Sequence, residues 1–540
     1  MAVQHEGTSK PQGLHYEIII VGAGAGFFIY LLYLKVLPKA LLFWSVHGGQ
    51  IELISGVTAV CGIILGVVQL WNRYVDWDYD RAITRKHVNA VSLGVDESGK
   101  PVALRQEFRK SHAQICGTTS CGKTESAILP WAIHDIETGA GLLIIDGKSD
   151  HSFLDKLYAY VHKSGRTKDF KLFSIANPGP SSSFNPLAGG EPGEVAERVF
   201  SSFEFENEHY KNIQYKIFLS LIRLIYSQGR IPTFALVQRL LTDMVILNVW
   251  KESCPDENLK REIELFIKTP DKERGENISG LDASLSHFCV GKAAELFNSE
   301  SPQIDLNEAL ENGQICYFQL PTLYAPFLGR VTGKLVLQAF QGAVARRHLG
   351  MTESKKFFSC FLDDFQDYIY PGFGALLNKS RSANIGVVFS HQSLGDLSKV
   401  SPDFRDVVLT NTNIKVVMRS NDPQACEYFA KSFGTAAAEK ATERQIKSIF
   451  GHTRTGEGSV RDVEEFKVNP NVIRSLETGQ GIVTIPHRKG VKILKIIFSM
   501  RKDLDPVPLP RVIKDPFILS QSIIPPLSQD IEKYRATDKE

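Results

Sequence analysis

The stretch Ala113-Gln-Ile-Cys-Gly117-Thr-Thr-Ser-Cys-Gly122-Lys123-Thr124-Glu125 decides the fold of most of this chain. Residues 117–124 fit the pattern GxxxxGK[ST], which forms a phosphate-binding loop when it follows a strand and precedes a helix. Ala113–Cys116 is typical of a short buried strand, and a helical pattern begins at Glu125. Strand, loop and helix come in the required order, so the sequence predicts an α/β nucleotide-binding fold.

Backbone N–H groups of such a loop, together with the N-terminus of the following helix, bind phosphate oxygens. We expect Lys123 to reach the β- and γ-phosphates of ATP and Thr124 to coordinate Mg²⁺. The predicted nucleotide-binding residues are Gly117, Thr118, Thr119, Ser120, Cys121, Gly122, Lys123, Thr124 and Glu125.

A site of this kind also needs an acidic metal partner at the end of a strand, and the sequence offers two candidates. One is Asp146, after the apolar run Leu142–Ile145, and the other is the pair Asp363-Asp364. The pair suits a division of labour in which Asp363 holds Mg²⁺ and Asp364 polarises the attacking water. Asp146 is then a structural or supporting acid, and a solvated acidic turn remains the alternative for the pair.

Two further polar residues are candidates for catalysis. Gln392 follows the apolar run Ile385–Ser390 and can contact the γ-phosphate. Arg381 lies just before that run and could act on a neighbouring subunit as an arginine finger, although arginine is common in loops.

From about Asp76 onward, short apolar runs alternate with helical patterns, as in a parallel sheet covered by helices on both faces. Between Pro192 and Ala309 the patterns are helical without convincing strands, which predicts an inserted all-α domain.

The chain has 540 residues and a net charge of only +2, which excludes a polycationic DNA-coating protein. Its eight cysteines form no CxxC pair, so the sequence favours reduced thiols over zinc or disulfides.

The N-terminal region contains two apolar stretches of the length that a membrane-spanning helix needs, at about 18–37 and 51–71. Basic residues follow the second stretch, which predicts a two-helix hairpin in the bacterial inner membrane with the bulk of the chain in the cytoplasm. Gly22, Gly24 and Gly26 also resemble a dinucleotide-binding turn, but Phe27 stands where the third glycine of GxGxxG is required. The spacing of Gly22 and Gly26 fits close packing of two membrane helices better.

The predicted organisation has five parts: a transmembrane hairpin (1–75), the first part of the nucleotide-binding domain (76–190), the inserted all-α domain (191–310), the second part of the nucleotide-binding domain (311–500) and a proline-rich tail (501–540).

Several motifs in this order resemble the TraD/TraG-type coupling ATPases of conjugative and type IV secretion systems. Beyond the phosphate loop they are Asp146-Gly-Lys148-Ser-Asp150, Phe184-Asn-Pro-Leu187, Asp363-Asp364, Gln392-Ser393 and the run Asn413–Asp422. The resemblance covers the chain from the hairpin to about Phe498. Two departures are Asp364, where the family usually has Glu, and Ser149, where Gly is usual.

The resemblance implies a RecA-like motor domain, a homo-hexamer around a channel, and movement of single-stranded DNA with its relaxase, or of effector protein, into a type IV secretion channel. Relaxosome proteins and channel components are the partners that it implies. Other functions stay open: a DNA pump of the FtsK kind, an ATPase that moves only protein, a membrane scaffold with a degenerate nucleotide site, or a flavin-linked oxidoreductase.

Overall fold

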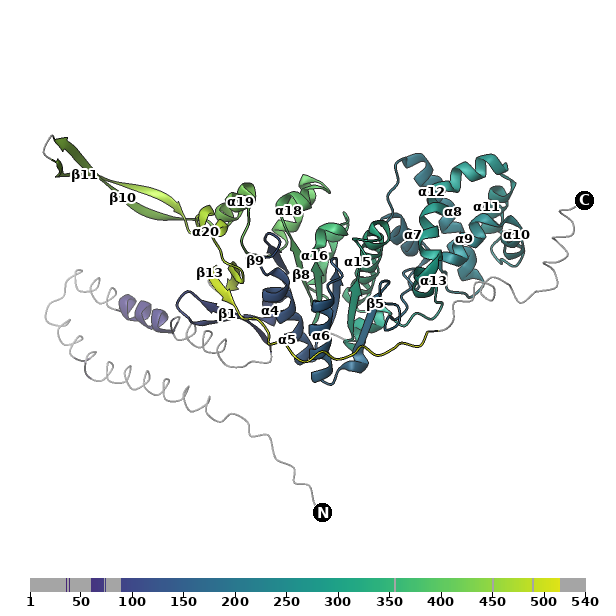
Figure 1. Cartoon of the computed structure of the whole chain (residues 1–540), viewed down its shortest axis with the longest axis horizontal. Coiled ribbons are helices and arrows are strands. Elements are labelled where there is room, and N and C mark those ends of the chain that lie inside the picture. Colours follow the sequence, from purple (N-terminus) through teal and green to yellow (C-terminus); the bar gives the residue numbers. More distant parts are fainter. Residues whose placement is uncertain are drawn as a thin grey trace, which may run out of the picture. The chain divides into compact units, whose positions relative to one another are not determined.

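The computed structural model describes residues 35, 38, 60–71, 73, 89–353, 356–448, 451–487 and 490–514 (Figure 1). The described residues from 89 onward belong to one compact unit. Its centre is an 11-stranded sheet with the strand order β2-β1-β13-β12-β9-β3-β8-β7-β4-β6-β5.

The sheet has a parallel part and an antiparallel part. The parallel strands are β3 (Ala113–Cys116), β4 (Gly141–Asp146), β5 (Phe170–Ser174), β6 (Ile315–Gln319), β7 (Phe358–Asp363), β8 (Ile385–His391) and β9 (Ile414–Val417). The antiparallel strands are β1 (Ala90–Asp96), β2 (Pro101–Arg105), β12 (Gln480–His487) and β13 (Gly490–Phe498). The predicted α/β class with a mainly parallel sheet is therefore confirmed.

Alternate residues of the buried strands face two different apolar cores, because successive side chains of a strand point to opposite faces. In β4, Leu142 and Ile144 pack into one core with helices α5 (Leu129–Glu137) and α6 (His151–Lys163). Leu143 and Ile145 pack into the other core with α15 (Pro326–His348) and α16 (Phe373–Ser380). Helices thus cover both faces, which explains why these strands read as continuous apolar runs.

Only helices, and no strands, lie between β5 and β6 in this fully described part of the chain. They are α7 (Pro192–Phe200), α8 (Glu208–Ser227), α9 (Phe234–Thr242), α10 (Met244–Glu252), α11 (Glu257–Lys268), α12 (Asp271–Cys289), α13 (Gly291–Phe297) and α14 (Leu306–Asn312). Several begin at a residue whose side chain accepts backbone N–H bonds, such as Asp243 before α10 and Asp256 before α11. Their apolar residues join the same core as α15, so the helical insertion packs against the helices of the sheet domain.

The remaining elements connect or extend the sheet. They are α4 (Gln106–Arg109), η2 (Lys123–Ile128), η3 (Thr167–Asp169), η4 (Phe365–Asp367), α17 (Leu394–Ser398), α18 (Pro402–Thr410), α19 (Pro423–Phe433), β10 (Thr435–Ser448), β11 (Gly451–Phe466) and α20 (Pro470–Arg474). Strands β10 and β11 pair with each other as a separate two-stranded ribbon.

The first part of the predicted tail is an extended strap without helix or strand. Its backbone accepts a bond from Tyr160 at Lys502 and donates one from Val512 to Gly179. Leu504, Val507 and Leu509 pack against the core beside α5 and α6. Residues 515–540 lie outside the described part of the chain.

The predicted membrane hairpin also lies largely outside the described residues. Within them, no helix has both the length and the apolar character needed to cross a membrane. Residues 60–71, in the second predicted span, form a helix whose large apolar side chains, including Val60, Ile64 and Leu70, are exposed.

Candidate nucleotide site

The predicted phosphate loop connects β3 to the helical turn η2. Gly117 N–H donates to His391 O (3.3 Å) and Thr118 N–H donates to Arg419 O (2.9 Å), so the neighbouring strands β8 and β9 anchor the start of the loop. Gly117 must be glycine, because a Cβ there would lie 2.6 Å from Cys121 Sγ. Gly122 has a φ of +97°, a left-handed conformation that suits glycine.

Lys123 is almost fully buried and points back into the loop. Its Nζ donates to Gly117 O (2.7 Å) and to Thr118 O (3.2 Å). The ammonium therefore lies within the curve of the loop, where phosphates bind in a site of this kind.

Thr124 and Asp363, the two predicted metal ligands, are in direct contact. Thr124 Oγ1 donates to Asp363 Oδ2 (2.6 Å), and Ser390 Oγ donates to Asp363 Oδ1 (2.5 Å). Burial, reinforced by the charge of the adjacent Asp364, raises the pKa of Asp363, whereas these two bonds lower it. A hydroxyl and a carboxylate held together at the end of a phosphate loop are suitable oxygen ligands for Mg²⁺.

Asp364 is buried beside Asp363 in a left-handed conformation with φ +47°. Its backbone N–H donates to Asp363 Oδ1 and to Ser390 Oγ, both at 3.1 Å. Its Oδ2 forms an ion pair with Lys148 Nζ (3.1 Å), while its buried Oδ1 has no hydrogen-bond partner. One carboxylate oxygen is thus left without a hydrogen-bond partner from the protein.

Asp146 is opposite Asp363 in the register of β4 and β7, but its oxygens are fully used by the protein. They accept from the N–H groups of Lys148, Ser149 and Asp150, and from the Tyr317 hydroxyl. Burial raises the pKa of Asp146 to about 7. Asp146 therefore stabilises the turn after β4, and its oxygens are not available to bind a metal ion.

Gln392 follows β8, which lies between the strand of the phosphate loop and the strand of Asp363. Its Oε1 accepts a long bond from Thr119 Oγ1 (3.4 Å), so it lies beside the loop. The preceding residue, His391, is fully buried, and its Nε2 lies 2.7 Å from Gln114 Nε2.

Arg381 does not lie beside the loop within one chain, and Glu125 is paired with a residue of another helix. Arg381 is exposed and precedes the start of β8, whereas the loop follows the end of the parallel neighbour β3, so the two lie at opposite ends of the strands. Its role on a neighbouring subunit stays a prediction. Glu125 forms an ion pair with Lys156 (3.1 Å) on α6.

Sequence reasoning missed several residues that build the site. Ser390 entered the sequence analysis only as the end of a strand, and Tyr317 and Tyr368 were not identified. Tyr368 O–H donates to Asp363 O (2.9 Å) and thereby supports the acidic turn. Polar residues in a buried strand, such as Ser390, are the one signal that could have found them.

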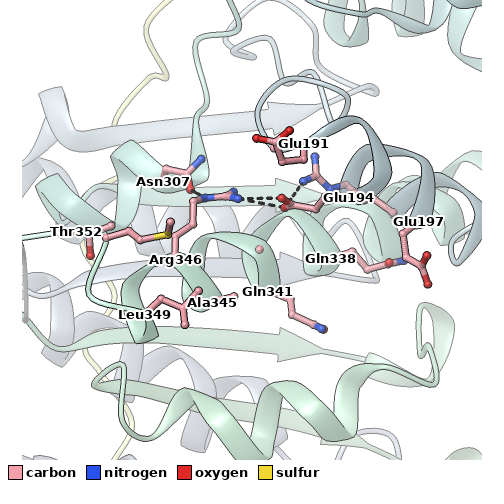
Figure 2. Close-up of a pocket in the computed structure, with 14 residues that line it drawn as sticks. Glu191, Glu194, Glu197, Asn307, Gln338, Gln341, Ala345, Arg346, Leu349 and Thr352 are labelled. Carbon is pink, nitrogen blue, oxygen red and sulfur yellow. Dashed lines mark hydrogen bonds and ion pairs between the residues drawn. The ribbon is translucent and has the colours of Figure 1, made fainter. Parts of the chain in front are cut away.

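A large cavity lies elsewhere in the described part of the chain. It has a volume of about 870 Å³ and lies between α7 and α15, with Glu194 bonded to Arg198 and Arg346 along one side (Figure 2). None of its lining residues belongs to the phosphate loop or the acidic pair.

A family model described as the TraM recognition site of TraD and TraG matches residues 358–477. The type 4 coupling protein DotL of Legionella pneumophila is 22% identical in an alignment of length 414, which covers 65% of this chain and 52% of DotL. The chain therefore spans about half the length of this curated relative.

Among solved structures, the conjugative coupling protein TrwB in complex with sulphate has a TM-score of 0.57 and 16% identity, over 80% of this chain and 94% of that one. TrwB in complex with ADP and Mg²⁺ gives a TM-score of 0.57 and 15% identity over the same shares. At this identity, the likeness establishes the fold.

The sheet order, the phosphate loop and the acidic pair at the end of β7 define the fold of a RecA-like P-loop NTPase. The resemblance read from the motifs is also confirmed: the chain is related to the TraD/TraG-type coupling ATPases.

Proposed function

We propose that this protein is an inner-membrane-anchored ATPase that uses ATP hydrolysis to recruit a substrate and move it into a type IV secretion channel. The observation that carries the proposal is the contact between Thr124 and Asp363 directly beside Lys123, with the free oxygen of Asp364 next to it. Binding and hydrolysis of a nucleoside triphosphate require these groups together.

The residues fit Mg-nucleotide. Gly117 allows the loop to pack closely against Cys121, and Thr124 and Asp363 offer oxygen ligands. Mg²⁺ bound there supplies positive charge that stabilises the developing charge on the transferred phosphoryl group. Lys123 binds the β- and γ-phosphates, Asp364 orients and deprotonates water, and Gln392 detects the γ-phosphate.

The proposed substrate is single-stranded DNA with its relaxase, and the proposed assembly is a homo-hexamer in which Arg381 acts on the neighbouring subunit. The relation to TraD/TraG-type proteins supports this choice, as does the structural similarity to TrwB, a conjugative coupling protein. The exposed apolar side chains of residues 60–71 support a membrane anchor.

The test is ATP hydrolysis by the full-length chain, with and without single-stranded DNA, beside Lys123→Ala. Hydrolysis that rises with DNA and is lost in the variant supports a DNA-coupled motor. Hydrolysis that is lost in the variant but does not respond to DNA favours a protein substrate. A folded chain that binds nucleotide without hydrolysing it refutes the motor and favours a scaffold.

A further inference from the structure

The two carboxylate oxygens of Asp364 differ in their hydrogen-bond partners. Oδ2 pairs with Lys148, whereas Oδ1 is buried without a partner. Buried carboxylate oxygens are nearly always hydrogen-bonded, so an unpaired one beside a phosphate loop points to a ligand such as water. Only Oδ1 is available to that water, and the orientation of Oδ1 depends on what holds Oδ2.

Lys148 is itself held in place by the turn after β4. Asp146 accepts the backbone N–H of Lys148 (2.9 Å) and also those of Ser149 and Asp150 (3.1 and 2.8 Å). Ser149 adopts a φ of +58°, and its hydroxyl donates to Leu320 O. On the other side, Gly147 N–H donates to Asp363 O (3.3 Å), so the backbone is held on both sides of Lys148.

In the described part of the chain, Lys148 is the one cation within ion-pair distance of Asp364. Asp363 is held differently, because the hydroxyls of Ser390 and Thr124 donate to it. The Asp364 carboxylate thus depends on one charge-assisted bond for its side-chain orientation. Charge-assisted bonds are about twice as strong as neutral ones.

We infer that Lys148 is a positioning residue for Asp364: by holding Oδ2 it aims Oδ1 at the attacking water. This inference rests on the proposed ATPase function. Lys148 does not contact the nucleotide in this role, so its loss affects the rate of the chemical step and leaves nucleotide binding intact.

The experiment measures kcat, KM for ATP and the affinity for ADP with Mg²⁺ in the full-length chain. Misplacement of a reacting group by about 1 Å costs about 100-fold in rate, so Lys148→Met should lower kcat by up to about 100-fold with KM and ADP affinity unchanged. Lys148→Arg should restore most of the rate, because a guanidinium also donates to a carboxylate. A structural role would not give rescue together with unchanged binding.

A double-mutant cycle gives the decisive readout. Asp364→Asn removes the base and should lower kcat by about 10²- to 10⁴-fold. In that background Lys148→Met should cost nothing further, because its effect passes through Asp364. The melting temperature without nucleotide should fall no further in the double variant than in the single variants, because either substitution alone already breaks the ion pair between Lys148 and Asp364.

Lys334→Met is the matched control. Lys334 lies on α15, away from the loop, and forms an ion pair with Glu204 (3.2 Å). It should leave kcat and KM unchanged. Additive losses in the cycle, or a raised KM in Lys148→Met, would overturn the role of Lys148 while the ATPase function stands. Absence of hydrolysis by the unaltered chain would overturn the ATPase function and this role together.

Discussion

Acidification should destabilise this protein through its buried histidines, and His391 gives the clearest test. His391 is fully buried, with Nδ1 2.8 Å from Ser393 O and Nε2 2.7 Å from Gln114 Nε2. Nδ1 must carry the proton that is donated to the carbonyl, and Nε2 accepts from the amide, so the neutral imidazole satisfies both bonds. Burial lowers the pKa of His391 to about 4.

The direction of the change in stability follows from the pKa of His391 in the unfolded and in the folded protein. The unfolded chain takes up a proton near pH 6.5, and the folded protein only near pH 4, so stability present above pH 6.5 is lost as the pH falls toward 4. At pH 5 the loss is about 2 kcal/mol for His391. Burial lowers the pKa of His112 equally, to about 4, which adds about the same amount.

The assay is urea unfolding of the full-length chain at pH 7 and at pH 5. His391→Gln keeps a polar side chain but cannot titrate, so its loss of stability between the two pH values should be smaller than that of the unaltered chain by about 2 kcal/mol. His209→Gln, at an exposed position, should change nothing. An equal loss in His391→Gln and in the unaltered chain would refute the reasoning.

Three other substitutions test the sheet, the loop and the helical insertion. Arg109→Met leaves the buried Asp135, now bonded at 2.5 and 2.6 Å, without its counter-ion, and should cost about 3–5 kcal/mol in urea unfolding. Adding Asp135→Leu should recover much of that loss, and no recovery would contradict the ion-pair explanation. Gly117→Ala brings a Cβ to within 2.6 Å of Cys121 Sγ and should weaken ADP binding in calorimetry; unchanged affinity would show that the loop can relax. Glu194→Gln removes the charge shared by two arginines between α7 and α15, and should lower unfolding stability by about 1–3 kcal/mol; equal stability would mean that the pairs contribute little.

The parallel part of the fold could be predicted because its strands are buried on both faces. Runs such as Leu142–Ile145 and Ile385–Phe389 are then continuously apolar and easy to recognise. Strands β1 and β2 lie at the edge and alternate buried with exposed residues around Gly94, so no apolar run marks them. The ribbon of β10 and β11 was missed for a similar reason, since its sequence is mainly polar and it pairs only with itself.

The centre of the candidate site could also be predicted, because a phosphate loop is a local pattern. Contacts between residues on neighbouring strands could not be predicted, because they depend on the order of the strands in the sheet. Ser390 reaches Asp363 only because β8 and β7 are neighbours, and Lys148 reaches Asp364 only because β4 and β7 are. The position of Arg381 away from the loop likewise follows from the direction of β8, which no motif encodes.

The pairing of β1 with β13 has a consequence for biosynthesis. Roughly 400 residues separate these strands, and β1 and β2 join the sheet only through β13. At about 5–20 residues per second, a ribosome needs about 20–80 seconds between the two strands. During that time the apolar side chains of β1 and β2 cannot pack against β13. We expect chaperones to protect this edge of the sheet in the nascent chain.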